Sequence, residues 1–369
     1  MSSFHKLAVS QVRQLTAQAC SVQFSVPDEL RASYAFQPGQ HLTLRRLAGA
    51  EEDRRTYSIC STPAELAERG ELRIGVKRIP SGLFSGWLTG SLDAPADPAG
   101  LLVGDLVEVM TPAGRFGTAT GTDRDGRQLG CLAAGSGITP MLSVIATVLA
   151  TEPASQVSLI YGNRTSAEVM FLEELADLKN RYPDRLTLLH VLSGEPQLSE
   201  LLTGRIDAAK IATLLADPAT QAASIDEWFL CGPFGMVTAA RDALSAGGVA
   251  ESRIHTELFF AGEAPPDLEP DSGHDPAERS EVTVTLSGRT STVAVGYSGA
   301  SILDAVLASR PDAPYACKGG VCGTCRARLT GGEVRMSRNY ALEPDELAAG
   351  LVLACQSHPV TETVSLEFL

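Results

Sequence analysis

Hydrophobic residues follow three successive patterns along the chain. Up to residue 117 the apolar runs are short, alternating or rich in β-branched residues, and turns containing glycine or proline separate them. The clearest runs are 42–44, 72–76 and 106–110. This spacing is typical of antiparallel strands joined by turns. We therefore expect an antiparallel β-barrel or sandwich in this part of the chain.

From residue 128 onward, apolar runs alternate with helical stretches. The apolar runs are 129–134, 157–161, 186–191 and 228–231. The helical stretches are 141–149 and 168–180. Strands that alternate with helices pair in a parallel sheet whose faces the helices cover. The pattern predicts a doubly wound α/β domain.

The third pattern follows a break in the apolar runs. Residues 261–280 contain four prolines, two glycines and mostly acidic charged side chains, with almost nothing to bury, which is typical of a linker. Beyond it, 281–286 and 292–295 predict a hairpin, and 302–308 predict a helix. We expect domains at 1–120, 121–262 and 280–369, with a linker over 263–279.

The composition narrows the class of protein. A chain of 369 residues with 44% hydrophobic residues can bury two or three cores. The formal net charge of −14 argues against a nucleic-acid partner, because phosphate binding depends on Lys and Arg, and suits docking to a basic patch on another protein. No apolar run is long enough for a signal peptide in the first 30 residues or for a membrane span anywhere. We therefore expect a cytoplasmic protein with neither a nucleic acid nor a membrane as partner.

Four of the eight cysteines gather near the carboxyl end of the chain. They are Cys317, Cys322, Cys325 and Cys355. Their C-x4-C-x2-C spacing with a distant fourth cysteine is that of plant-type [2Fe-2S] ferredoxins, and the three glycines inside the loop give its backbone freedom to wrap a cluster. A structural zinc site is the alternative, although zinc ribbons favour paired C-x2-C motifs. Small core residues are predicted at Cys20, Cys60 and Cys131.

Two short motifs in the first predicted domain point to a flavin. Residues 55–58 read Arg-Thr-Tyr-Ser, and residues 81–85 read Ser-Gly-Leu-Phe-Ser at the start of a predicted helix. Both are similar to flavin-binding motifs of the ferredoxin–NADP reductase superfamily. A helix start also presents unpaired N–H groups to an anion. Each motif alone is short enough to occur by chance, and a tyrosine on a strand more often packs in a core or on a surface.

The resemblance implies a role for each residue of these motifs. Arg55 would pair with the FAD pyrophosphate, Tyr57 would lie against the isoalloxazine ring, and Ser58 would hydrogen-bond near its reactive N5 atom. The remaining implied flavin contacts are Thr56, Val76, Lys77, Gly82, Leu83, Phe84 and Ser85.

A glycine loop at residues 133–140 leaves one predicted strand and enters a predicted helix, which is the context of a pyrophosphate-binding loop. Its sequence is not G-x-G-x-x-G but resembles the G-x-G-I-x-P loop of the same superfamily. The resemblance implies that Gly135, Thr139 and Pro140 lie at the nicotinamide side of the coenzyme. An ordinary strand-to-helix turn is the alternative for this loop by itself.

Two further segments complete the implied hydride-transfer pocket. Cys231-Gly232-Pro233 ends a predicted strand and is similar to the superfamily's C-G-P strand end beneath the nicotinamide. Glu257 and Phe259 match the segment that closes the flavin site, with a carboxylate near the ring and an aromatic side chain that shields it. Taken alone, they would also fit a buried aromatic residue beside a solvated acid. The implied catalytic residues are Ser58, Cys231 and Glu257.

The adenosine end of the coenzyme is expected after the second strand of the α/β domain. Residues 161–166 place Arg164 and two hydroxyl side chains there, with no acidic residue to bind a free ribose 2′-hydroxyl. This pattern favours NADPH. NADH stays the alternative, because related reductases with the same Asn-Arg pair are not uniformly specific for NADPH.

The order of the three domains matches one class of oxygenase reductases within the superfamily. Several stretches resemble the reductase components of phenylacetyl-CoA epoxidases, namely 4–7, 57–61, 76–80, 315–322 and 339–347. The resemblance implies a β-barrel that binds FAD, an α/β domain that binds NAD(P)H, and a β-grasp-like α+β ferredoxin domain. It further implies that electrons pass through FAD and the [2Fe-2S] cluster to a diiron oxygenase that epoxidises the ring of phenylacetyl-CoA.

Two other functions remain open from the residues alone. The same motifs would serve the reductase of a different oxygenase, acting on a steroid or on another aromatic acid. A binding module without catalytic turnover would need zinc in the cysteine loop and flavin motifs that no longer function.

Overall fold

The computed structural model describes residues 4–48, 51–80, 82–90, 100–217, 224–259, 278–342 and 344–369. The chain forms two compact units. A barrel and a parallel sheet make up the first unit, and a mixed sheet near the carboxyl end makes up the second. Most of the expected linker lies outside the described residues, as do Ser81 and Glu343 of the motifs named above.

Six strands form the barrel of the first unit, in the order β4-β3-β6-β1-β2-β5. They are β1 (Phe4–Thr16), β2 (Ala19–Ser25), β3 (His41–Ala48), β4 (Glu51–Ser58), β5 (Glu71–Lys77) and β6 (Leu106–Met110). Strand β1 pairs antiparallel with β2 and β6, β2 with β5, and β3 with β6. A bridge between Ile59 and Ile74 joins the end of β4 to β5, so the two edge strands meet and the sheet closes. Two short helices flank β5 in the sequence, α1 (Pro63–Arg69) and α2 (Leu83–Thr89).

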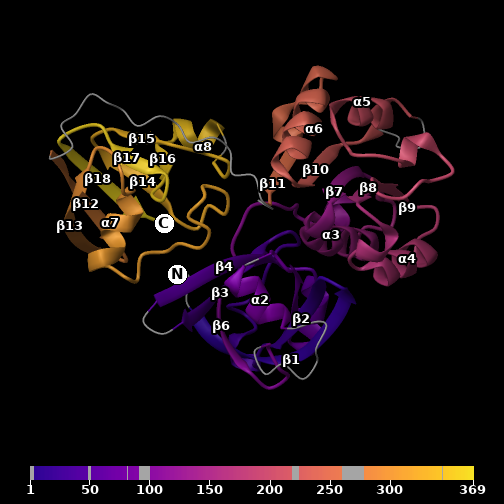
Figure 1. The fold of residues 1–369 in the computed structure, drawn as a ribbon, viewed down its shortest axis with the longest axis horizontal. Coiled ribbons are helices and arrows are strands. Elements are labelled where there is room, and N and C mark those ends of the chain that lie inside the picture. The colour runs from indigo at the N-terminus through magenta and orange to yellow at the C-terminus, as the bar shows by residue number, and fades with distance from the viewer. Residues whose placement is uncertain are drawn as a thin grey trace. The chain divides into compact units, whose positions relative to one another are not determined.

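The parallel sheet has the strand order β11-β10-β7-β8-β9, and every neighbouring pair is parallel. Its strands are β7 (Gln128–Ala134), β8 (Gln156–Asn163), β9 (Leu186–Leu192), β10 (Glu227–Gly232) and β11 (Ile254–Leu258). Its helices are α3 (Ile138–Thr151), α4 (Leu172–Arg181), α5 (Ala208–Ala216) and α6 (Phe234–Ala246). Figure 1 shows α3 and α4 on one side of this sheet and α5 and α6 on the other. The expected doubly wound domain is confirmed.

Helix α4 begins later than the sequence pattern predicts, at Leu172 and not at residue 168. Phe171 precedes it with a φ of 58°, a left-handed conformation that interrupts a right-handed helix. The pattern also did not reveal α5 and α6. Their apolar positions are filled in part by alanine, which contributes little to a hydrophobic pattern.

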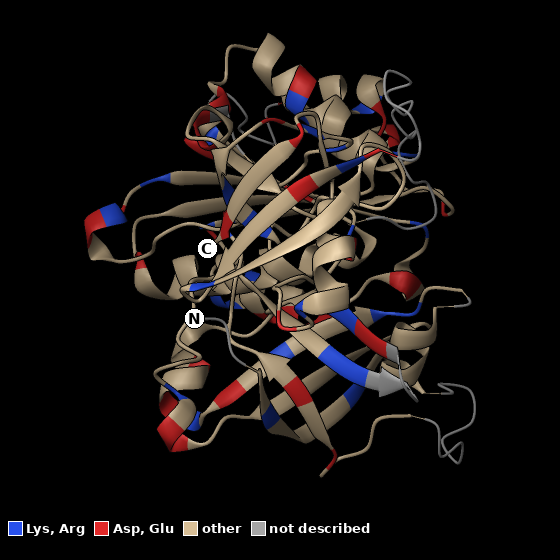
Figure 2. Cartoon of the chain, turned by 90° about the vertical axis from the view of Figure 1, so that its left-hand side faces the viewer, with Lys and Arg blue, Asp and Glu red and all other residues tan. Residues whose placement is uncertain are grey.

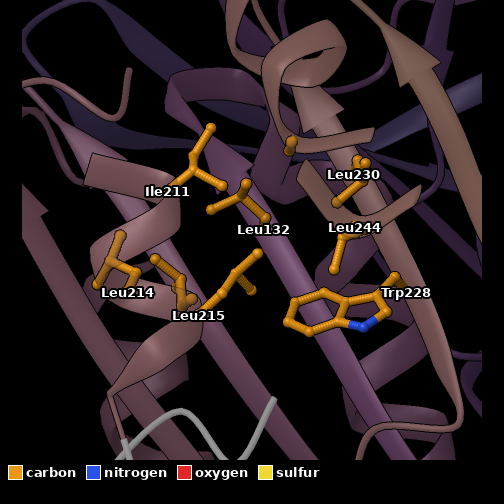
Figure 3. A pocket seen from close by; sticks show the side chains of 9 residues that line it. Leu132, Ile211, Leu214, Leu215, Trp228, Leu230 and Leu244 are labelled. Atoms are coloured by element: carbon orange, nitrogen blue, oxygen red, sulfur yellow. The ribbon is translucent and has the colours of Figure 1, made fainter. Parts of the chain in front are cut away.

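A small apolar cavity lies between the parallel sheet and the helices α5 and α6 (Figure 3). Leu132 and Trp228 line it from the sheet, Ile211 from α5 and Leu244 from α6. Its volume of about 10 Å³ is at the limit for one water molecule. The cavity is therefore a packing feature of this layer and offers no room for a coenzyme.

The second unit contains a mixed sheet of order β13-β12-β18-β14-β16 and a two-stranded ribbon of β15 and β17. The strands are β12 (Arg279–Leu286), β13 (Arg289–Gly296), β14 (Arg326–Gly331), β15 (Val334–Met336), β16 (Leu351–Leu353), β17 (Ser357–Pro359) and β18 (Thr363–Phe368). The helices are α7 (Ile302–Ser309) and α8 (Pro344–Ala348). Strands β12 and β13 form the predicted hairpin, and β12 pairs in parallel with β18. This is the α+β arrangement that the sequence predicts.

Apolar side chains fill the interior of both units. The described residues form three buried apolar clusters, and the predicted core cysteines are buried in two of them, Cys20 in one and Cys60 with Cys131 in another. Basic and acidic residues are interspersed along the strands and loops (Figure 2). No helix in the described part of the chain has both the length and the apolar character needed to cross a membrane.

Candidate functional site

A serine, a cysteine and a glutamate meet where the barrel adjoins the carboxyl ends of the parallel strands. Ser58 ends β4, Cys231 lies in β10 and Glu257 lies in β11. Ser58 Oγ donates a hydrogen bond to Glu257 Oε2 at 3.1 Å, and Cys231 Sγ lies 4.0 Å from the same oxygen. The structure thus brings together the three residues that the sequence predicts to be catalytic.

Glu257 is placed where it can hold or release a proton near neutral pH. Its side chain is 13% exposed, and burial raises the pKa of the carboxyl to about 7, while the hydrogen bond from Ser58 opposes this rise. Burial, together with the neighbouring Glu257, raises the pKa of the Cys231 thiol, which therefore stays protonated. Among the three, Glu257 is the group suited to general acid–base work.

His41 in β3 is a fourth titratable residue at this position, and sequence analysis missed it. Its Nδ1 atom lies 3.9 Å from Glu257 Oε1. Burial lowers the pKa of His41 to about 4, so the imidazole is neutral, and its Nε2 atom has no hydrogen-bond partner within the described residues. No local motif marks this histidine, because only the pairing of β3 in the barrel brings it beside β11.

The predicted pyrophosphate loop forms one 3-10 turn, Gly135–Gly137, between β7 and α3. Gly135 has a φ of 53°, in the region that favours glycine, and its carbonyl accepts a hydrogen bond from Tyr161 Oη at 2.8 Å. A Cβ atom at Gly137 would lie 2.2 Å from the carbonyl oxygen of Cys231. The loop therefore contacts both neighbouring strands, β8 and β10, and position 137 has no room for a side chain.

The first turn of α3 continues this loop. Thr139 and Pro140 are both buried, and Thr139 Oγ1 donates to the carbonyl of Ser136 at 3.0 Å. The first N–H groups of a helix lack partners inside the helix and favour an anion at this end. The loop can therefore bind a phosphate group while its glycines allow close approach of the backbone.

The strand end Cys231-Gly232-Pro233 lies directly beside the loop. The carbonyl of Gly232 accepts a hydrogen bond from the Phe259 N–H at 3.1 Å, and Pro233 immediately precedes α6. Phe259 packs against the apolar cluster that contains Cys231 and Ile138. Three segments that the sequence predicts for one pocket, around residues 135, 232 and 258, are therefore adjacent.

The two predicted flavin motifs lie next to each other on the barrel. The ring of Tyr57 in β4 lies 6.2 Å from that of Phe84 in α2, and Trp87 packs edge-on against Phe84 at 5.3 Å. Ser85 Oγ accepts a hydrogen bond from the N–H of Ile79 at 3.1 Å, which fixes the turn before α2. Phe84 and Ser85 are themselves buried, so Tyr57, which is partly buried, is the predicted contact in this group whose ring could meet a flavin.

The side chains of the other predicted flavin contacts differ in how far they are exposed to solvent. Arg55 is exposed, Thr56 is half-buried, and Leu83 is 82% exposed. The side chain of Val76 is buried in the barrel core, so only its backbone could meet a ligand. Lys77 Nζ lies 4.0 Å from Glu168 Oε2, on the side of β5 that faces the glycine loop.

Arg164, predicted at the adenosine end of the coenzyme, directly follows β8. Its side chain is exposed, and its carbonyl accepts a hydrogen bond from the Gly194 N–H at 2.7 Å. The backbone is therefore fixed while the guanidinium is accessible to a phosphate group. An exposed arginine here is compatible with the predicted NADPH contact.

The four clustered cysteines form two pairs in the second unit. Three of them lie in the loop between α7 and β14, and the fourth follows β16. Cys317 lies close enough to Cys322, and Cys325 close enough to Cys355, for each thiol to shift the pKa of its partner. No group of three or more His, Cys, Asp or Glu side chains in the described ranges is placed to hold one metal ion. A [2Fe-2S] centre takes two thiolates on each iron, and two thiol pairs can supply them.

Backbone donors around these cysteines also fit a cluster. The N–H groups of Gly319 and Cys322 donate to Cys317 Sγ at 3.3 and 3.4 Å. These bonds, after the larger effect of the Cys322 thiol, lower the pKa of Cys317, whereas the neighbouring sulfurs and burial raise the pKa of Cys322 and of Cys325. Gly320 and Gly323 have φ values of 76° and 66°, so the loop uses the freedom that its glycines give.

Two protein-family models match the chain. The oxidoreductase NAD-binding domain matches residues 131–242, and the 2Fe-2S iron-sulfur cluster binding domain matches residues 284–360. The first range covers the parallel sheet from within β7 into α6, and the second includes all four clustered cysteines. The predicted nucleotide-binding and iron-sulfur domains are confirmed.

Similar proteins span nearly the same length. One subunit of the 1,2-phenylacetyl-CoA epoxidase of Escherichia coli strain K12 is 45% identical over 368 residues, covering 100% of this chain and 98% of that protein. The ferredoxin reductase component of the 3-ketosteroid-9-alpha-monooxygenase of Rhodococcus rhodochrous is 34% identical over 374 residues, covering 98% and 96%. The solved structure of phthalate dioxygenase reductase superposes with a TM-score of 0.55 at 23% identity, covering 99% and 98%, and shows the same fold.

Proposed function

Because the chain belongs to the family of iron-sulfur oxidoreductases that are reductase components of oxygenases, we propose that it takes a hydride from NADPH, or from NADH, and passes single electrons through FAD and a [2Fe-2S] cluster to an oxygenase. The observation that carries this proposal is that one chain holds two groups of residues suited to electron transfer. The first is the buried Ser58, Cys231 and Glu257 group beside the glycine loop, and the second is the paired cysteines.

When bound, FAD accepts two electrons together and releases them singly, which matches a cluster that carries one electron at a time. The chain's own residues position the cofactors and control one proton. Ser58 Oγ donates a hydrogen bond to Glu257 Oε2, so these two residues could move a proton between a flavin bound on the barrel and the buried carboxylate.

The binding roles follow from position. We assign FAD to residues 1–120, with Arg55 at the pyrophosphate and Tyr57 at the ring. We assign the coenzyme to residues 121–262, with its pyrophosphate at the glycine loop and Arg164 at the adenosine phosphate. The cluster is assigned to residues 280–369.

The proposed partner is a diiron phenylacetyl-CoA epoxidase in the cytoplasm. The similarity to a component of the Escherichia coli epoxidase over the whole chain supports this partner. A ketosteroid monooxygenase is the second candidate, supported by the 34% identity to its ferredoxin reductase component over 98% of the chain.

Partner-dependent consumption of NADPH separates these candidates. The purified chain is mixed with the oxygenase components of a phenylacetyl-CoA epoxidase or with a ketosteroid monooxygenase, each with and without its substrate. We expect phenylacetyl-CoA to stimulate NADPH consumption with the epoxidase, and no stimulation by the steroid with its oxygenase. Stimulation in the steroid system alone would replace the proposed partner.

We expect NADPH oxidation with ferricyanide as acceptor to rise with pH, with a midpoint near 7, because Glu257 is protonated below its pKa of about 7 and can accept a proton above it. Glu257→Gln keeps the shape but cannot titrate, so the inflection should disappear. Ser58→Ala should move the inflection to higher pH, because it removes the hydrogen bond that lowers this pKa. An unchanged inflection in Glu257→Gln would assign it to another group.

The NADPH preference should depend on Arg164. We expect Arg164→Ala to lower kcat/KM for NADPH roughly tenfold, the size of one lost hydrogen bond to a charged group, and to leave NADH nearly unaffected. Arg181→Ala, at an exposed arginine in the last turn of α4, is the matched control. Equal losses with both coenzymes would count against an NADPH contact at this residue.

A further inference from the structure

The outward face of β5 makes a row of contacts with the α/β domain. Side chains alternate along the strand, and one set fills the barrel core: Leu72, Ile74 and Val76. The other set points away from that core and consists of Arg73, Gly75 and Lys77, named here the β5 outer face. Each residue of this face meets a different segment of the domain that carries the glycine loop.

Arg73 forms a two-pronged ion pair with Glu174 in α4. Its Nη1 and Nη2 atoms lie 2.7 and 2.8 Å from the two carboxylate oxygens, and Arg13 of β1 contacts the same carboxylate. The Arg73 side chain is 14% exposed and Glu174 24%, so water competes little for this pair. The pair fixes both the distance and the orientation of α4 relative to the barrel.

Gly75 allows β5 and the α/β domain to approach each other closely. A Cβ atom there would lie 2.5 Å from Thr139 Cγ2 and 3.0 Å from the ring of Phe171. Thr139 belongs to the first turn after the glycine loop, and on the opposite side Gly137 touches the backbone of Cys231. The loop is thus held between β5 and β10 at distances that only glycine permits.

Lys77 extends the row to the start of the loop. Its Nζ atom lies 3.7 Å from the position of a Cβ atom on Gly135 and 4.0 Å from Glu168 Oε2. The β5 outer face therefore contacts the glycine loop at both of its ends and α4 beyond it.

We propose that the β5 outer face sets the position of the glycine loop relative to the flavin-binding barrel, and that Arg73 and Glu174 are positioning residues for hydride transfer. This inference rests on the proposed function. Hydride transfer needs reacting atoms about 3–3.5 Å apart, and a displacement of about 1 Å can cost a hundredfold in rate. Strand β5 carries the predicted flavin contacts Val76 and Lys77, and its outer face also contacts the glycine loop. A shift of the loop relative to β5 would therefore change the distance between the coenzyme and the flavin.

Gly75→Ala is the first test. The added methyl group must displace Thr139, Phe171 or the strand, and Gly75 has no positive φ that would add backbone strain. We expect the long-wavelength charge-transfer absorbance of the coenzyme-bound protein to weaken, and flavin reduction by NADPH in stopped-flow to slow by roughly tenfold to a hundredfold. FAD and iron contents should match wild type. Gly331→Ala, a strand glycine whose nearest neighbours would be 3.6 Å away, is the matched control and should behave as wild type.

The rescue variant Gly75→Ala/Thr139→Ser removes the Cγ2 atom that the new methyl group meets and keeps the hydroxyl that bonds Ser136. We expect it to recover part of the charge-transfer absorbance and of the reduction rate. A loss in Gly75→Ala that appears only as lower melting temperature or FAD content, without recovery in the double variant, would assign these contacts to folding and overturn the inference.

Glu174→Gln tests the ion pair, with the exposed neighbour Glu173→Gln as control. Neither Arg73 nor Glu174 is assigned to the coenzyme, so Glu174→Gln should lower kcat several-fold and raise KM by less. The control Glu173→Gln should change neither kcat nor KM. If both test variants match wild type while wild type oxidises NADPH, the inference fails and the proposed function stands. If wild type itself does not oxidise NADPH, the proposed function fails first.

Discussion

Cys322→Ala is expected to abolish NADPH-driven reduction of cytochrome c, by at least about a hundredfold, while ferricyanide reduction stays near the wild-type rate. Cys322 belongs to the cysteine pair nearest the surface, because Cys317 and Cys322 are half-buried whereas Cys325 and Cys355 are buried. Removing one of the four thiolates leaves one iron with a single cysteine ligand, so we expect the cluster to be lost. The residues proposed to bind FAD are unchanged in this variant, so we expect an acceptor that takes electrons directly from the flavin to be reduced as before.

The control for this prediction is Cys20→Ala, which removes a buried cysteine from the barrel core. It should keep both activities and cost only some stability, because a small cavity replaces the sulfur atom. If Cys322→Ala retained full cytochrome c reduction, electrons would have to leave the protein without the cluster.

Gly137→Ala is expected to lower the kcat/KM for NADPH by roughly a hundredfold. Its backbone has a φ of −61°, which alanine adopts freely, so the effect comes from contact alone. The new Cβ atom would lie 2.2 Å from the carbonyl oxygen and 2.6 Å from the carbonyl carbon of Cys231. Backbone atoms in a central strand cannot move aside as a side chain can, so the loop itself must shift away from β10.

Gly235→Ala in α6 is the matched control, because no atom would lie within 4 Å of its Cβ. It should bind the coenzyme as wild type does and even favour the helix slightly. Gly137→Ala should keep its FAD and iron contents, and the loss should show as weaker binding of NADPH and slower flavin reduction. Wild-type coenzyme kinetics in Gly137→Ala would contradict the placement of the coenzyme at this loop.

Local patterns predicted the fold well where each element has a strong signal of its own. The run 106–110 is β6 in the structure, and the runs 281–286 and 292–295 lie in the hairpin of β12 and β13. The cysteine loop was equally clear, because three ligands fall within nine residues and the glycines between them take the positive φ values that such a loop needs. In each case the information lies within a few neighbouring residues.

Contacts between distant segments were not visible in the sequence. His41 lies near Glu257 although the two are 216 residues apart in the sequence, and Arg73 pairs with Glu174 although these are 101 residues apart. Both contacts depend on how the barrel docks against the parallel sheet, which no local pattern encodes. The resemblance to a known superfamily predicted that Ser58, Cys231 and Glu257 would share one pocket, whereas the residue types alone fitted ordinary packing.

The content of iron, acid-labile sulfide and flavin in freshly isolated, anaerobically handled protein tests the central claim most directly. The account predicts two irons, two sulfides and one FAD per chain, held by the four paired cysteines and the barrel, with visible absorbance that NADPH bleaches. A colourless protein that contains zinc and neither sulfide nor flavin would contradict it.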